Sequence, residues 1–314
     1  MKHLISLRET SAADIRSLLD TAAVFKEIVE RPVKKVPTLR GRAMITLFYE
    51  NSTRTRTSFE MAAKIMSAEA INIAVAQSSV SKGESLKDTV LTLQSLKADC
   101  IVLRHSASGA AQFAAEHLNI PVVNAGDGRH EHPTQALLDM LTIRQHKGEL
   151  DGRTVAIVGD ITHSRVVRSN IWGLTKMGAK VRLVGPRTLM PLDACRLPVQ
   201  VYDDLRAGLE GADVVNVLRL QTERMDKGLL PSLREYARLF GISVNSLKAA
   251  KPDVMVMHPG PMNRGVEISA DVADGAHGIH SVIGEQVTNG VAVRMAVLYL
   301  LMGVQSEVLE RSPL

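Results

Sequence analysis

The stretch Phe48–Glu60, FYENSTRTRTSFE, gathers hydroxyl and guanidinium side chains behind an apolar run. Ser52 or a neighbour can cap a helix here, so residues 53–67 are expected to be helical. Backbone N–H groups at a helix start bind anions, and the guanidinium fork of Arg54 matches phosphate oxygens. Arg54 and Arg56 should point about 200° apart, so we expect Arg54 to contact the anion and Arg56 to form a supporting ion pair. A capped surface helix with solvated arginines is the alternative, but two cations at an already positive helix end favour an anion site.

A second cluster, HEHPTQALLD, places histidine and glutamine at another expected helix start, over residues 134–147. Pro133 suits the first helical position, which puts His132 at the cap and Gln135 in the first turn. A helix N-terminus lowers the pKa of a histidine, so His132 would be neutral and able to donate to a carbonyl oxygen. An ordinary His-Pro helix start explains the pattern equally well. The spacing of His130 and His132 could suit a metal, but no third ligand stands nearby, and no metal is predicted.

Two further sites in the first half of the chain leave alternatives open. The loop QSSVSKGESLKDT, residues 77–89, would present Ser78 and Lys82 to an anion. Its composition is nevertheless that of an ordinary surface loop, which the pattern alone favours. Arg104 directly follows a buried apolar run and needs a counter-charge, so a ligand contact and a structural ion pair are equally plausible.

The second half of the chain carries three polar clusters, VGDITHSRVVRSN, VLRLQTER and MHPGPMNRG. Arg165, Arg219 and Gln221 could clamp a carboxylate-bearing substrate, and the prolines around Gly260 suit the presentation of carbonyl oxygens. The G-x-G-x-x-G fingerprint is missing after Gly159, no Walker A sequence exists, and no nucleophile pattern stands out. Many cationic donors without a nucleophile favour a transferase whose substrates react directly with each other.

The elements that must position these residues follow a regular alternation of short apolar runs and amphipathic stretches. Expected strands cover residues 43–49, 70–76, 99–104, 120–126, 154–160, 180–186, 199–204, 213–220 and 253–260. Helical patterns separate most of them, which predicts an α/β fold of two doubly wound parallel-sheet domains. The helix at 134–147 would join the domains, and a final helix at 285–303 would return to the first one.

We therefore expect one domain over residues 1–149 plus 285–314 and the other over residues 150–284. Each polar cluster follows an expected strand, and ligands of such sheets bind at the carboxyl ends of the strands.

Composition narrows the class of protein. A net charge of +5 suits an acidic partner, but aromatic residues make up only 3% and no basic block occurs, so nucleic acid is not expected. The two cysteines, Cys100 and Cys195, are isolated, which suggests neither disulfides nor a zinc site. With no long apolar stretch and no signal-peptide pattern, a cytoplasmic enzyme without cofactor or membrane association is the expectation.

In order along the chain, the tags STRTR with SFE, SKGES, LRH, HPTQ, HSRV, LRLQ and HPGP resemble the aspartate/ornithine carbamoyltransferase family. Each tag alone is weak, but together they are highly specific and span nearly the whole chain. The chain looks like the aspartate branch, because His258-Pro259-Gly260-Pro261 replaces the H-C-L-P segment of ornithine enzymes and no S-M-G segment occurs.

The resemblance implies transfer of a carbamoyl group from carbamoyl phosphate to the amine of L-aspartate, as in pyrimidine biosynthesis, with an ornithine or other amino-acid carbamoyltransferase as the alternative. It assigns carbamoyl phosphate to Ser52, Thr53, Arg54, Thr55, Arg104, His132, Gln135, Gly260 and Pro261. Of these, Arg54, Thr55, Arg104 and His132 would act in catalysis, together with Lys82. Aspartate would be held by Lys82, Arg165, Arg219 and Gln221.

The resemblance further implies a homotrimer in which Ser78 and Lys82 reach the neighbouring subunit's site. The sequence leaves open whether a regulatory chain or a dihydroorotase associates with it.

Overall fold

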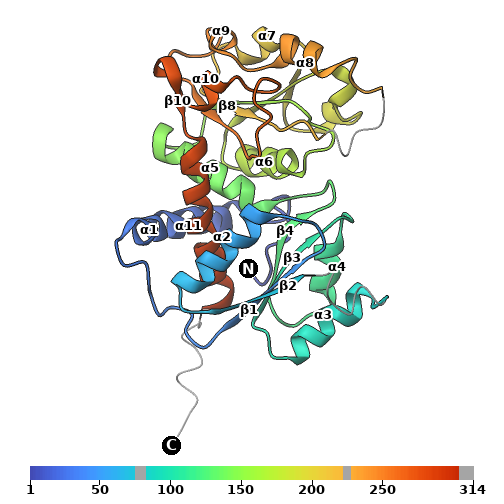
Figure 1. Cartoon of the computed structure of the whole chain (residues 1–314), viewed down its shortest axis with the longest axis vertical. Coiled ribbons are helices and arrows are strands. Elements are labelled where there is room, and N and C mark those ends of the chain that lie inside the picture. Colours follow the sequence, from blue (N-terminus) through green and yellow to red (C-terminus); the bar gives the residue numbers. More distant parts are fainter. Residues whose placement is uncertain (75–82, 222–227, 304–314) are drawn as a thin grey trace, which may run out of the picture. The chain divides into compact units, whose positions relative to one another are not determined.

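The computed structural model describes residues 1–74, 83–221 and 228–303 (Figure 1). Its contacts divide the chain into two compact units, one comprising Met1–Thr134 with the chain from Gly290, the other Gln135–Asn289. The domain boundaries expected from the sequence, at 149/150 and 284/285, stay a prediction. Helix α5 (Pro133–Lys147) and helix α11 (Ile283–Met302) each run across the division between the units.

The first unit is built on a four-stranded parallel sheet in the order β2-β1-β3-β4. Its strands are β1 (Ala43–Phe48), β2 (Glu69–Ala74), β3 (Cys100–His105) and β4 (Val122–Asp127). Its helices are α1 (Ala12–Glu30), α2 (Thr53–Ile65), α3 (Leu86–Ser95) and α4 (Ala110–His117). Figure 1 shows α3 and α4 on one side of this sheet and α2 on the other.

Local sequence explains these elements. Ser11 caps α1 by accepting a hydrogen bond from the Asp14 amide, as expected for a serine before an amphipathic run. Every residue of β4 is buried, and its polar residues Asn124 and Asp127 are hydrogen-bonded within the first unit. Alternate residues of β1, Ile45 and Leu47, pack with α3 and α4 in one apolar cluster. The first unit thus has the doubly wound form that the sequence predicts.

The second unit contains a six-stranded parallel sheet in the order β10-β9-β8-β5-β6-β7. Its strands are β5 (Thr154–Val158), β6 (Lys180–Val184), β7 (Gln200–Tyr202), β8 (Val214–Val217), β9 (Met255–Met257) and β10 (His280–Ser281). Besides α5, its helices are α6 (Arg165–Lys176), α7 (Leu205–Leu209), α8 (Leu233–Phe240), α9 (Val244–Leu247) and α10 (Ala270–Ala273). The sequence pattern misses β10, because two residues are too few to show a period.

Each sheet contains one switch point, a strand whose two neighbours in the sheet are reached by connections that run to opposite sides of it. In the first unit, β2 lies beside one edge of β1 and β3 beside the other. In the second unit, β6 and β8 flank β5 in the same way. Ligands of open α/β sheets bind at the carboxyl ends of strands next to such a switch point.

Candidate active site

The loop after β1 delivers the N-terminus of α2 to the switch point of the first sheet. Ser52 is the N-cap residue, but its side chain makes no capping hydrogen bond and no acidic residue occupies the first turn. Thr55 is buried at 7% exposure, whereas Thr53 and Arg54 are exposed. Arg56 is also exposed. Its supporting ion pair stays a prediction, while the helix start keeps the properties of an anion site.

Arg104 lies at the carboxyl end of β3, on the other side of the same switch point. Its backbone is in register with Phe48 of β1. Its guanidinium donates from Nη1 to the carbonyl of Ala125 at 3.1 Å, and its Nε lies 3.5 Å from Oε2 of Glu50. The structural ion pair considered from the sequence is therefore formed. The same contacts hold the guanidinium beside Glu50, two residues after β1. A ligand contact of Arg104 stays a prediction.

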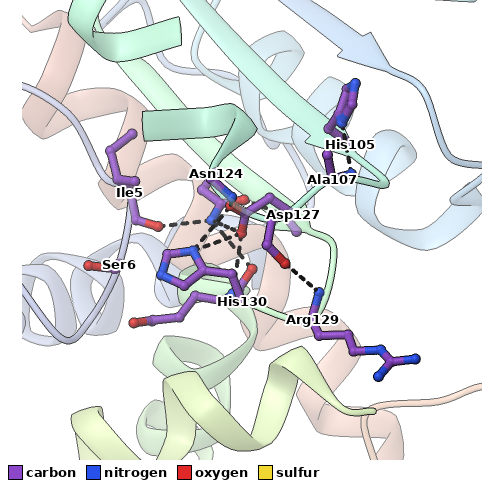
Figure 2. A network of polar contacts seen from close by, with 12 residues as sticks. Ile5, Ser6, His105, Ala107, Asn124, Asp127, Arg129 and His130 are labelled. Atoms are coloured by element: carbon purple, nitrogen blue, oxygen red, sulfur yellow. Dashed lines mark hydrogen bonds and ion pairs between the residues drawn. The ribbon is translucent and has the colours of Figure 1, made fainter. Parts of the chain in front are cut away.

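The turn after β4 is held by a buried carboxylate (Figure 2). Asp127 Oδ1 accepts from the Asn124 side-chain amide at 2.8 Å, and Oδ2 accepts from the Gly109 backbone at 2.8 Å. His130 Nδ1 lies 3.1 Å from the same carboxylate, and Figure 2 shows the Asn124, Asp127 and His130 side chains converging. His130 thus belongs to the turn.

Across residues 1–74, 83–221 and 228–303, no group of three or more His, Cys, Asp or Glu side chains is arranged to hold a metal ion.

The turn presents His132 directly before α5. Glu131, 1% exposed, accepts from the backbone amides of Leu7 at 2.7 Å and Arg8 at 3.2 Å, which ties the turn to the N-terminal segment. His132 is itself buried at 5% exposure, and Pro133 is the first residue of the helix, as the sequence predicts. The position of His132 is therefore set by contacts on both sides of it.

In the second unit, Asp160 joins the segments that follow the adjacent strands β5 and β8. It follows β5, and its Oδ1 lies 2.8 Å from Nδ1 of the buried His163. Its Oδ2 accepts from the backbone amide of Gln221, which follows β8, at 3.4 Å. Arg165, the first residue of α6, is only 4% exposed, and Arg219 is half-buried. Arg165 therefore begins the helix that follows β5, and Arg219 and Gln221 follow β8. Their action as a carboxylate clamp stays a prediction.

The backbone of residues 258–261, which follow β9, is held by hydrogen bonds of His258. The backbone amide of Gly260 donates to Nδ1 of His258 at 2.8 Å, so the ring proton is on Nε2, which lies 3.3 Å from Oε1 of the buried Glu267. The His258 backbone amide donates to Oε1 of Gln286 at 2.8 Å. The Gly260–Pro261 peptide bond is cis. These contacts fix the backbone whose carbonyls the sequence assigns to a ligand amide.

One prominent residue is absent from the expectations. Asp139, on α5 and 0% exposed, accepts hydrogen bonds from the side chains of Gln135 at 3.0 Å, Asn170 at 2.9 Å, Asn216 at 3.3 Å and Gln286 at 2.8 Å. Burial raises the pKa of this carboxyl to about 6, although the four amide donors oppose the rise. An aspartate inside the apolar run ALLDM, four residues after Gln135, was the available sequence signal.

The structure therefore gathers the predicted residues into groups within each unit. In the first unit, Ser52, Thr53, Arg54, Thr55 and Arg104 lie around the carboxyl ends of β1 and β3, and His132 follows β4. In the second, Arg165, Arg219 and Gln221 lie around β5 and β8, Gly260 and Pro261 follow β9, and Gln135 is on α5. Ser78 and Lys82 lie outside the described residues.

Two family models match the chain, and they meet near the end of α5. Residues 2–145 match the model described as aspartate/ornithine carbamoyltransferase, carbamoyl-P binding domain. Residues 151–301 match the model of the Asp/Orn binding domain of the same enzymes. The chain belongs to the aspartate/ornithine carbamoyltransferase family.

Among its relatives, the aspartate carbamoyltransferase catalytic subunits of Desulforamulus reducens and Heliobacterium modesticaldum are each 60% identical over 302 residues, covering 96% of both chains. Aspartate transcarbamoylase from Trypanosoma cruzi, solved in complex with N-(phosphonacetyl)-L-aspartic acid, superposes with a TM-score of 0.87 at 34% identity, covering 96% of each chain. Ornithine carbamoyltransferase from Pyrococcus furiosus gives 0.85 at 28% identity, covering 96% of this chain and 97% of its own.

Among the described helices, none combines the length and the apolar composition needed to cross a bilayer.

Proposed function

We propose that this chain is an aspartate carbamoyltransferase, which transfers the carbamoyl group of carbamoyl phosphate to the amine of L-aspartate and releases phosphate. The observation that carries the proposal is 60% identity over 96% of the chain to catalytic subunits of that name. The product, N-carbamoyl-L-aspartate, would serve pyrimidine biosynthesis.

The arrangement of charge supports an anionic donor. Carbamoyl phosphate would bind at the start of α2, with its phosphoryl group on the helix amides, the hydroxyls of Ser52 and Thr53, and Arg54. Its carbonyl oxygen would accept from Thr55, Arg104 and His132, and its amide would meet Gln135 and the carbonyls of Gly260 and Pro261.

The arrangement also supports an acidic acceptor. Arg165 and Arg219 supply two fixed cations at the ends of β5 and β8, and a substrate with two carboxylates satisfies both. The cationic side chain of ornithine would meet these guanidiniums with the wrong sign of charge. Gln221 would complete the aspartate site, with Lys82 contributed by a neighbouring subunit.

The reaction needs no protein nucleophile. The neutral amine of aspartate forms a bond to the carbamoyl carbon while Thr55, Arg104 and His132 stabilise the oxyanion. The bond from that carbon to the phosphate oxygen then breaks, and phosphate leaves against Arg54, Lys82 and the α2 amides. The departing phosphate takes the proton from the amine, so no further acid or base is required.

We propose in addition that the enzyme works as a homotrimer in the cytoplasm, with Ser78 and Lys82 completing the site of the neighbouring subunit. A regulatory chain or a dihydroorotase as partner remains an alternative to the free trimer. Analytical ultracentrifugation of the purified protein measures the assembly directly, and a catalytically active monomer would refute the shared site.

The test of the function is a carbamoylation assay with aspartate and ornithine offered separately alongside carbamoyl phosphate. We expect turnover with aspartate only. Arg165→Gln should raise the KM for aspartate at least about tenfold, since a hydrogen bond to a charged group contributes roughly 1.5–3 kcal/mol. Arg168→Gln, an exposed arginine on the same helix, is the matched control and should leave that KM unchanged. Faster carbamoylation of ornithine would overturn the assignment.

A further inference from the structure

Asp139 is surrounded by amide side chains from four separate elements. Gln135 shares helix α5 with it, Asn170 is on α6, Asn216 is on β8 and Gln286 is on α11. Oδ1 accepts from Gln135 and Gln286, and Oδ2 accepts from Asn170 and Asn216. A carboxylate has about four lone-pair sites, so this one is fully occupied by four N–H donors.

An ionised carboxylate can only accept hydrogen bonds, and this fixes the direction of each surrounding amide. Every one of the four must turn its NH2 group toward Asp139 and its carbonyl oxygen away. An amide that turned the other way would set its oxygen against a carboxylate oxygen in a buried place, which is unfavourable because neither oxygen would have a donor. Asp139 therefore sets the orientation of Gln135 and Gln286, so that each turns its carbonyl oxygen toward its other neighbours.

The first consequence concerns Gln135, which is half-buried in the first turn of α5. Its Nε2 is engaged by Asp139, and among the described residues no group donates to its Oε1. The second consequence concerns Gln286, whose outward Oε1 accepts from the backbone amide of His258 at 2.8 Å. That bond anchors the start of the segment that carries the Gly260 and Pro261 carbonyls.

We propose that Asp139 is a positioning residue that makes this enzyme select a donor bearing an NH2 group, because it turns Gln135 Oε1 outward as an acceptor and anchors the His258–Pro261 backbone through Gln286. The inference rests on the proposed function. It assigns the preference for a carbamoyl over an acyl group to a carboxylate that does not itself contact the substrate.

The probe for this role is acetyl phosphate, which carries a methyl group where carbamoyl phosphate carries NH2. Both compounds use the phosphoryl site equally, so the ratio of their dissociation constants isolates the NH2 contacts. We would measure the Kd of carbamoyl phosphate and, by competition, that of acetyl phosphate on the purified full chain. In Asp139→Asn at least one amide must turn its oxygen inward, and the preference for carbamoyl phosphate should fall about tenfold, as expected for one or two neutral hydrogen bonds.

The matched control is Asp213→Asn in the same unit. Asp213 is a buried carboxylate that accepts from the Thr154 amide and from Lys251 Nζ, neither of which the site uses. This variant should leave the ratio of the two Kd values unchanged. Where Asp139→Asn fails to fold, Gln286→Met removes the bond that Gln286 accepts from His258 and the bond that it donates to Asp139, and leaves the other three donors of Asp139 in place. This variant should still lower the ratio about threefold, the value of one weaker hydrogen bond.

The outcomes separate the two proposals. A wild-type chain that does not carbamoylate aspartate would remove the proposed function. A wild-type chain that does, combined with an Asp139→Asn variant that weakens both compounds equally, would show that Asp139 is merely structural and would overturn the inference. An unchanged ratio of the two Kd values in Gln286→Met would refute the contribution of the contact between Gln286 and the His258 amide.

Discussion

Replacing Asp139 by asparagine removes a buried carboxyl group whose ionisation lowers the free energy of unfolding. Burial raises the pKa of this carboxyl from 3.8 to about 6. Each pKa unit corresponds to about 1.4 kcal/mol, so ionising Asp139 in the folded chain costs about 3 kcal/mol.

The sign of the pH dependence follows from linkage. The folded state binds the Asp139 proton more tightly than the unfolded state, so the free energy of unfolding falls as pH rises between about 4 and 6. Below that window the carboxyl is protonated in both states and the cost is absent. Above it the full cost applies. Relative to Asp139→Asn, the wild type should therefore lose about 2 kcal/mol of stability between pH 4 and pH 7, since part of the cost already applies at pH 4.

The assay is urea unfolding of both proteins at matched pH values across this window, reported as the difference between their unfolding free energies. Other titrating groups cancel in that difference. Asp213→Asn provides a control of opposite sign. Burial works to raise the pKa of Asp213, but hydrogen bonds from Lys251 and the Thr154 amide hold it below its ordinary value. Its contribution to stability is therefore lost as pH falls. A difference for Asp139→Asn that stays flat from pH 4 to 7 would refute this account of the buried carboxylate.

Three further results are expected. Arg54→Ala should lower kcat/KM for carbamoyl phosphate about a hundredfold, since two hydrogen bonds to a charged group are lost; near-normal turnover would remove Arg54 from the site. Gly185→Ala should lower Tm, because the new Cβ would lie 2.7 Å from the Gly159 carbonyl oxygen, and an unchanged Tm would contradict that packing. Burial raises the pKa of the Cys100 thiol to about 12, so a thiol reagent should label only the exposed Cys195 in the native protein and both cysteines after unfolding.

The positions of the catalytic candidates at strand ends could be predicted from the sequence because they depend on local signals. The helix start at Pro133, the cap at Ser11 and the buried run of β4 are each set by a few neighbouring residues. The roles of the site residues toward substrates stay predictions, since they concern groups that the chain itself does not contain.

Tertiary contacts decided the features that depend on residues far apart in the chain. Strand order places β1 beside β3, and Arg104 at the end of β3 pairs with Glu50 after β1, a partner that the sequence alone did not indicate. Asp160 joins the segments after β5 and β8 only because these strands are adjacent in the sheet.

By itself, the sequence determined the alternation of strands and helices, the α/β class and the family tags, because each is written within short stretches of chain. Only the tertiary structure showed that Asp139 is the centre of a polar network. Its donors, Gln135, Asn170, Asn216 and Gln286, span more than 150 positions and belong to four elements. No local pattern relates such residues, since they meet only when the sheet and its helices pack around the same buried carboxylate.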